Sequence, residues 1–217
     1  MKPRVVVVGG GGHAKVVINI LQDTEEVDIV GYTDAGACSD GLCGCPYLGT
    51  DAILSDLFRS GVPYAFIAIG WNQRRMDLFR LIRGIGFEFV NAISPRACLS
   101  AYARIGEGVA VMPGAVINAG ARIGDGAIIN TNASVDHDCV VGQFAHVGPG
   151  ASLAGCIRLG EGAFLGTGCA VVPDIEIGGW TTVGAGAVVI RNLPAQVVAM
   201  GVPARIRRTM REAIVEN

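Results

Sequence analysis

A six-residue repeat in the C-terminal half of the chain is the feature that most constrains the fold. From Leu99 to Val189 every sixth residue is Ile, Leu or Val, without a break in register. The residue four positions later is usually Ala, Cys or Thr, and Gly often follows the aliphatic residue. Such a period indicates short strands joined by tight corners and stacked through parallel hydrogen bonds. We therefore expect a parallel β-helix of about five coils, in which three repeats form one coil of roughly 18 residues.

Composition and charge exclude several other classes of protein. Glycine makes up 32 of the 217 residues, which excludes a helical bundle because each glycine inside a helix costs roughly 1 kcal/mol relative to alanine. A net charge of −2 offers no basic surface for nucleic acid. No apolar run reaches the roughly 20 residues that span a membrane. Because the N-terminus does not resemble a signal peptide and the seven cysteines are irregularly spaced, we expect a cytoplasmic protein with reduced thiols.

The first 95 residues show a different pattern, in which apolar strands alternate with helical segments. The expected strands are 5–8, 28–32, 64–69 and 87–92, and the expected helices are 14–21, 53–60 and 76–83. This alternation is typical of a small parallel α/β sheet of the Rossmann type. Ser94 and Pro95 indicate a boundary. We predict a Rossmann-like α/β domain over residues 1–95 and an all-β domain, the β-helix with a short tail, over 96–217.

A glycine-rich turn near the N-terminus predicts a phosphate site. Gly9–Gly12 follow the first strand and His13 opens a helix, so backbone N–H groups and the helix N-terminus can face an anion. His13 either donates to a phosphate or caps the helix. With Asp34 placed to bind a ribose, the pattern also fits an NAD-binding domain. Since about 90 residues provide only one half of a dinucleotide fold, we favour a single nucleotide.

Further candidates follow the third strand, at the same carboxyl edge of the sheet. Gly70 and Asn72 close that strand, where open α/β sheets bind ligands. Arg74 and Arg75 are placed to reach an anion, although a solvated helix face explains them equally well. Cys38, Cys43 and Cys45 form the one cysteine cluster. A metal or redox site is one reading, but small residues in a loop fit their spacing better.

The segment Asp136-His137-Asp138 is the strongest candidate for catalysis. We place it on a surface strand, where nothing in the packing calls for an imidazole between two carboxylates. A neighbouring carboxylate fixes the tautomer of a histidine and raises its basicity, as a general base requires. The alternative is a histidine in a polar corner patch. The 18-residue coil places Gly155 directly beside His137, which leaves a cleft and a backbone N–H for an oxyanion.

Two more residues near this segment complete the expectations from the residues themselves. Cys139 should point inward with the other small residues. His146 lies half a coil from His137, so within one subunit the two histidines cannot touch, whereas across a subunit interface they could. An exposed or interface histidine without a catalytic role is the alternative reading of His146.

With these motifs in place, the chain resembles the bacterial sugar O- and N-acyltransferases of the sialic acid O-acetyltransferase (NeuD) group. Within that group it is most similar to the PglD-type and perosamine-type nucleotide-amino-sugar N-acetyltransferases. The motifs that carry the resemblance are Gly9–His13 with Lys15–Val17, Phe66–Gly70 with Asn72 and Arg75, Ile129–Thr131, Ser134–Cys139, His146–Val147, Ala154–Gly155 and Gly201–Ala204.

The resemblance implies a left-handed β-helix and a homotrimer that binds acetyl-CoA between adjacent subunits. It implies that His137 is the catalytic base and that Asp138 orients it. His146 would contact the thioester carbonyl and Gly155 the acyl group, while Ala185 and Arg205 would face CoA. The nucleotide-sugar side would include the residues already singled out in the first domain, namely Gly12, His13, Asp34, Gly70, Asn72 and Arg75.

The expected activity is direct transfer of acetyl from acetyl-CoA to the amine of a UDP- or GDP-linked 4-amino-4,6-dideoxy sugar, with no metal cofactor. One alternative is the same fold acting on a sugar hydroxyl, as in sialic acid O-acetylation. An alternative of another class is a non-catalytic β-helix scaffold that senses a nucleotide through its first domain. The choice between UDP and GDP, the sugar itself and the role of the cysteine loop are left open.

Overall fold

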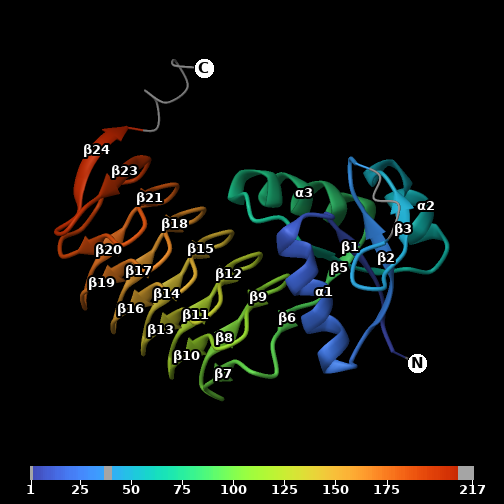
Figure 1. Cartoon of the computed structure of the whole chain (residues 1–217), viewed down its shortest axis with the longest axis horizontal. Helices are drawn as coiled ribbons and strands as arrows, with labels where there is room; N and C mark the ends of the chain where they lie inside the picture. The colour runs from blue at the N-terminus through green and yellow to red at the C-terminus, as the bar shows by residue number, and fades with distance from the viewer. Residues whose placement is uncertain (1, 37–40, 210–217) are drawn as a thin grey trace. The chain divides into compact units, whose positions relative to one another are not determined.

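The computed structural model describes residues 2–36 and 41–209. The chain divides into two compact units, Met1–Pro95 and Arg96–Asn217 (Figure 1). No helix in the described ranges is long and apolar enough to cross a membrane.

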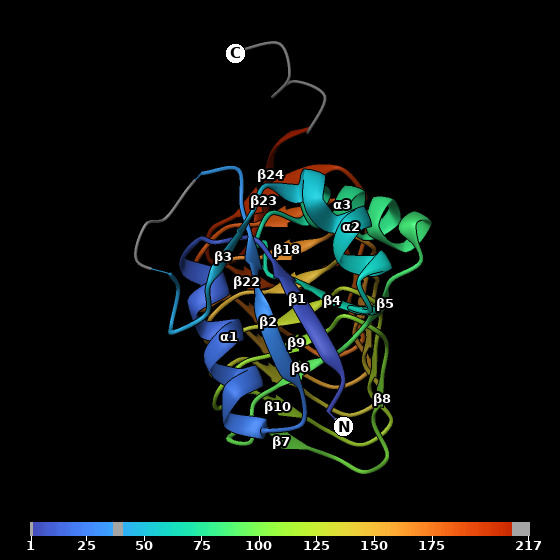
Figure 2. The same cartoon turned by 90° about the vertical axis from the view of Figure 1, so that its right-hand side faces the viewer.

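The first unit contains a five-stranded parallel sheet in the order β3-β2-β1-β4-β5 (Figure 2). Its strands are β1 (Arg4–Val8), β2 (Asp28–Thr33), β3 (Tyr47–Gly49), β4 (Tyr64–Ile67) and β5 (Glu88–Phe89). Its helices are α1 (Gly12–Thr24), η1 (Asp51–Ile53), α2 (Leu54–Arg59) and α3 (Asn72–Ile85). The unbroken apolar run of β1 forms the central strand and is fully buried, as parallel sheets covered on both faces require.

The expected α/β pattern is confirmed, with differences in the bounds of most elements and three larger ones. β3 was not expected, because it has only three half-buried residues. α3 begins at Asn72 rather than at Met76. The expected strand 87–92 is instead two short strands, β5 and β6 (Ala92–Ile93).

The second unit is a β-helix whose three sheets consist mainly of two-residue strands. The β7–β22 sheet comprises β7 (Cys98–Leu99), β10 (Val116–Ile117), β13 (Ser134–Val135), β16 (Ser152–Leu153), β19 (Ala170–Val171) and β22 (Val188–Val189). The β8–β20 sheet comprises β8 (Arg104–Ile105), β11 (Arg122–Ile123), β14 (Val140–Val141), β17 (Arg158–Leu159) and β20 (Glu176–Ile177). The β9–β23 sheet includes β9 (Ala110–Val111), β12 (Ile128–Ile129), β15 (His146–Val147), β18 (Phe164–Leu165), β21 (Thr182–Val183) and β23 (Val197–Met200), with β24 (Arg205–Thr209) antiparallel to β23.

The pairing of these strands confirms the 18-residue coil. Ile117 pairs with Val135 and Val135 with Leu153, each step being one coil along the chain. From Val111 onward the repeated aliphatic residues are buried, and so are most of the small residues four positions later. Cys139 is among them, as expected, and its thiol donates to the carbonyl of Ala154 at 3.0 Å.

Glycine is not the sole residue that turns the corners of the coils. One column of corner residues, 18 apart, adopts the left-handed conformation with φ values of 75°, 58°, 61° and 61° at Gly120, Asp138, Cys156 and Asp174. We name this set the left-handed column. It corrects one expectation, because His137 and Asp138 lie in a corner turn after β13 and not on a strand.

Candidate functional site

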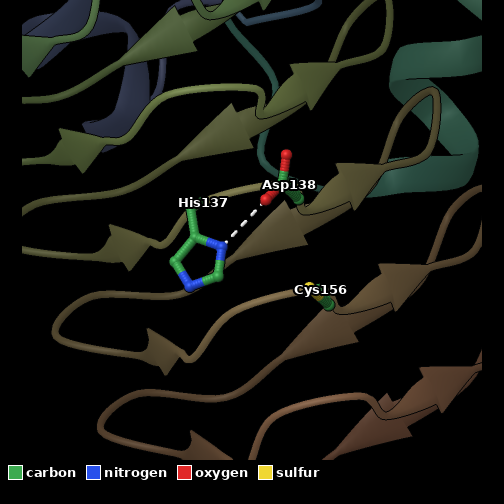
Figure 3. Close-up of side chains that lie close together, drawn as sticks. All are labelled: His137, Asp138 and Cys156. Atoms are coloured by element: carbon green, nitrogen blue, oxygen red, sulfur yellow. Dashed lines mark hydrogen bonds and ion pairs between the residues drawn. The ribbon is translucent and has the colours of Figure 1, made fainter.

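His137 and Asp138 form a hydrogen-bonded pair at the corner between β13 and β14. The ring Nδ1 lies 2.9 Å from Oδ2 of Asp138 (Figure 3). Because a carboxylate can only accept, Nδ1 carries the proton and donates it, which leaves Nε2 with a lone pair. The side chains are 57% and 66% exposed, so the free nitrogen is open to a substrate. The pair therefore has the arrangement of a general base and its orienting carboxylate.

Asp136 supports the turn rather than the ring. Its Oδ1 accepts the backbone N–H of His137 at 2.7 Å and the side-chain amide of Asn118 at 2.8 Å. The hydrogen bond from Asn118 is the main reason that the pKa of Asp136 is lowered, followed by the bond from His137. Asn118 lies 18 residues before Asp136, so a neighbouring coil holds the turn in place.

The surroundings of His137 raise its pKa above the ordinary value. The hydrogen bond to Asp138 is the largest cause, and the negative charges of Asp136, Asp138 and Asp174 add to it. Each of these groups stabilises the imidazolium relative to the neutral ring. The free Nε2 is therefore a stronger base than that of an isolated histidine.

Gly155 lies beside the ring of His137, where the 18-residue coil places it. A Cβ built on Gly155 would lie 2.5 Å from Nε2 and 2.6 Å from Cε1 of His137. These distances are too short for any side chain at position 155. Because glycine has none, Nε2 of His137 can occupy this space. Within the described ranges no group accepts the backbone N–H of Gly155, which leaves this donor available to a ligand.

His146 lies on β15, in the β9–β23 sheet, whereas His137 lies at the corner between the other two sheets. Its side chain is nearly buried, and its ring meets that of Phe164 edge to face with 5.1 Å between centroids. Nε2 of His146 is 2.9 Å from Nδ2 of Asn130, whose Oδ1 accepts the N–H of Thr131 at 2.8 Å. That second bond fixes the orientation of the Asn130 amide, so Nδ2 donates to Nε2 and the proton of His146 resides on Nδ1.

The two residues expected to face CoA lie near one end of the β-helix. Ala185 is exposed at the corner between β21 and β22. Arg205 begins β24, and its guanidinium donates to the carbonyl of Ala204 at 3.0 Å. The turn that precedes Arg205 is fastened to Val188, which donates to the carbonyl of Gly201 and accepts from the N–H of Ala204.

In the first unit, Asp34 fastens the glycine-rich turn. Its Oδ2 accepts the N–H of Gly10 at 2.6 Å, and its Oδ1 accepts the N–H of Gly36 at 2.9 Å. Both oxygens thus accept hydrogen bonds from backbone N–H groups, a role that sequence spacing did not reveal. At Gly11 and Gly12 an added Cβ would meet nothing within 4 Å, and α1 has no side-chain cap. The first N–H groups of this helix are therefore open to an anion.

His13 is held neutral next to this helix start. Burial, and then the nearby charge of Arg75, lower its pKa to about 4. Its Nε2 is buried, and the described part of the chain offers it no hydrogen-bond partner. At neutral pH the ring can act toward a phosphate only as a neutral donor, and not as a cation.

Arg75 shapes the turn after β4 and does not face solvent. The residue is 1% exposed, and its guanidinium donates to the carbonyls of Ile69 and Gly70 at 2.9 and 3.0 Å and to Oδ1 of Asn72 at 2.9 Å. Burial lowers its pKa to about 9. Residue 75 lies on the buried face of α3, together with Met76 and Phe79, so a solvated helix face does not explain Arg75. Its expected contact with a ligand stays a prediction.

Several residues around the site were not anticipated. Asn118, Asn130, Cys156 and Asp174 each contact or influence Asp136, His137 or His146. Asn118 lies 18 residues before Asp136 and Cys156 lies 18 residues after Asp138, so both could have been found from the length of the coil, and Asp174 by adding 18 a second time. Of the cysteine cluster, Cys38 lies outside the described residues, and Cys43 and Cys45 belong to no group of three possible metal ligands in the described ranges.

Two known families match different parts of the chain. Residues 4–82 match the family described as the PglD N-terminal domain. Residues 102–137 match the bacterial transferase hexapeptide repeats. No match was found among curated protein sequences.

Solved structures give closer similarities. A variant of perosamine N-acetyltransferase from Caulobacter crescentus, with one histidine replaced by asparagine and with CoA and GDP-perosamine bound, is 50% identical. The alignment covers 94% of this chain and 96% of that one, with a TM-score of 0.91. The acetyltransferase domain of PglB from Neisseria gonorrhoeae, bound to acetyl coenzyme A, is 34% identical over 95% and 100% of the two chains, with a TM-score of 0.91. WeeI from Acinetobacter baumannii is 28% identical over 94% and 99%, with a TM-score of 0.80.

Proposed function

Because the chain belongs to the family of left-handed β-helix nucleotide-amino-sugar N-acetyltransferases, we propose that it acetylates the 4-amino group of a GDP-linked 4-amino-4,6-dideoxy sugar. Transfer of acetyl from acetyl-CoA to the amine of a nucleotide-linked amino sugar is the activity of this family. The choice of GDP is supported by the 50% identity to the enzyme bound to GDP-perosamine. The observation that carries the catalytic assignment is the free Nε2 of His137, held by Asp138 and facing Gly155.

In the proposed mechanism His137 is the general base. The amine nitrogen attacks the thioester carbon and forms the C–N bond while Nε2 accepts a proton from the nitrogen. The C–S bond of the tetrahedral intermediate then breaks, and the imidazolium returns its proton to the CoA sulfur. Asp138 stabilises the imidazolium between these two steps, which is the state that its carboxylate favours.

The oxyanion of the intermediate needs hydrogen-bond donors. The N–H of Gly155 is one candidate, and the ring of His146 is the other. His146 and His137 lie on different sides of one coil, so the His146 that serves a given His137 comes from a neighbouring subunit. This requirement supports a homotrimer with sites between subunits, in which Ala185 and Arg205 contact CoA.

The first unit supplies the nucleotide site in this proposal. The open N–H groups at Gly11 and Gly12 bind the diphosphate, with His13 as a neutral donor. Asp34 and Arg75 hold the two surrounding turns, and Gly70 and Asn72 lie on the second of these. Since acetyl-CoA and nucleotide sugars are cytoplasmic metabolites, we place the reaction in the cytoplasm.

The experiment that tests the proposal is a comparison of acceptors at fixed acetyl-CoA. Purified enzyme is incubated with GDP-perosamine, with a UDP-linked 4-amino sugar and with free sialic acid, and products are identified by mass spectrometry. We expect N-acetylation of the GDP-linked sugar with the highest kcat/KM. Faster turnover of the UDP sugar would contradict the choice of nucleotide. Acetylation of a hydroxyl, or no turnover with any acceptor, would contradict the activity itself.

A further inference from the structure

A thiol lies next to the proposed base, and the mechanism does not use it. Cys156 is exposed, follows Gly155 directly and is the member of the left-handed column one coil beyond Asp138. Its backbone N–H donates to the carbonyl of His137 at 3.0 Å. Adjacent coils are about 4.8 Å apart, so the sulfur of Cys156 lies near His137 and Asp138 on the neighbouring coil.

His137, Asp138 and Cys156 bring three different ligand atoms together. One ring nitrogen, one carboxylate oxygen and the sulfur all lie within 4.8 Å of one another. Figure 3 shows Cys156 on the same side of the imidazole as the edge that is bonded to Asp138. Bond lengths of about 2.0–2.3 Å place the ligands of a tetrahedral zinc ion roughly 3–4 Å apart. The three side chains are exposed, so they can close that difference without disturbing the core.

We propose that Nδ1 of His137, the carboxylate of Asp138 and the sulfur of Cys156 form a site for a thiophilic divalent cation such as Zn²⁺, and that occupation of this site blocks acetyl transfer. Thiolate, imidazole and carboxylate are the three ligand types that zinc takes in proteins, and water completes the coordination. The two negative ligands neutralise the charge of the ion. The cation is an inhibitor here and not a cofactor.

The inhibition follows from where the protons go. The ion replaces the proton between Nδ1 and Asp138, and that proton moves to Nε2, which keeps the imidazole neutral. The thiol of Cys156 loses its proton to solvent as the S–metal bond forms, so each ion bound releases one proton. Nε2 then carries hydrogen and can no longer accept the proton of the amine. This second half of the inference rests on the proposed role of His137, whereas binding itself does not.

Binding is tested first, without substrates, on the full-length protein. Co²⁺ is titrated into wild type and into Cys156→Ala, with Cys98→Ala as a matched control because Cys98 is also exposed and lies in the β-helix. We expect a thiolate-to-cobalt charge-transfer band in wild type and in Cys98→Ala, displaced by Zn²⁺, and its loss in Cys156→Ala. No such band in wild type, or its persistence in Cys156→Ala, would overturn the site.

Inhibition is tested with Zn²⁺ in an assay that separates the acetylated sugar by chromatography. Detection of released CoA with a thiol reagent is unsuitable, because the reagent would also react with Cys156 and because zinc would bind the CoA thiol. We expect Zn²⁺ to inhibit wild type and Cys98→Ala reversibly, with recovery on adding a chelator. Cys156→Ala should need at least tenfold more Zn²⁺ for the same inhibition. Equal sensitivity of Cys156→Ala would refute the link to catalysis. If no acceptor were turned over, the cobalt titration would still decide the metal site.

Discussion

Alanine at position 155 should remove activity while leaving the fold intact. An added Cβ would lie 2.5 Å from Nε2 of His137, whereas nonbonded heavy atoms need about 3.5 Å. The ring must therefore move by about 1 Å or rotate away, because it is the exposed end of a side chain and the backbone beneath is fixed by the coil. A displacement of about 1 Å at a catalytic group costs on the order of 10²-fold in rate. We expect kcat/KM of Gly155→Ala to fall by that factor.

Stability should respond differently from activity. Gly155 does not have the positive φ that would strain an alanine. A change from Gly to Ala at a compatible position stabilises a fold by about 0.4–1 kcal/mol through the unfolded chain. The Tm of Gly155→Ala should thus equal or slightly exceed that of wild type. Gly84→Ala is the matched control, since an added Cβ there meets nothing within 4 Å and lies on α3, away from the β-helix.

The assay measures kcat/KM for the amino sugar at saturating acetyl-CoA, together with thermal unfolding. The double variant Gly155→Ala/His137→Ala should be no less active than His137→Ala, because the glycine acts through the ring. Wild-type kcat/KM in Gly155→Ala would refute the reasoning. So would losses that multiply in the double variant, or a Tm that falls by many degrees, because each would show that the glycine acts elsewhere.

Three further predictions concern the groups that orient the site. Asp138→Asn removes the main cause of the raised pKa of His137, so the acid limb of the kcat/KM–pH profile, where the base becomes protonated, should move to lower pH while the plateau falls. An unshifted limb would contradict the assignment of the base. Asn130→Ala frees Nε2 of His146 and should lower kcat by about 10-fold or more with little change in the KM for the sugar, measured by steady-state kinetics. Arg75→Met removes the donor to one buried and two half-buried acceptors, the side-chain oxygen of Asn72 and the carbonyls of Ile69 and Gly70, and should cost at least about 2 kcal/mol in denaturant unfolding. It should also raise the KM for the nucleotide sugar but not for acetyl-CoA.

The β-helix could be predicted in detail because its long-range contacts follow from the 18-residue period of the coil. Each residue has its neighbour 18 positions away, so the approach of Gly155 to His137 followed from sequence positions. The α/β unit has no such rule. The burial of Arg75 and the use of both oxygens of Asp34 depend on how α3 and the glycine-rich turn pack. Sequence spacing identified these residues but did not reveal these contacts.

The position of Asp138 at a corner, and not on a strand, explains how consecutive residues can form the catalytic pair. On a strand, adjacent side chains point to opposite faces, so His137 and Asp138 could not be joined by a hydrogen bond of 2.9 Å. The left-handed φ of 58° at Asp138 turns the chain between them and brings the carboxylate alongside the ring. Asp tolerates this conformation better than most residues. Aspartate thus suits the left-handed corner and also supplies the carboxylate that the histidine base requires. A pair of this kind can arise at a turn of the coil without any change in the coils around it.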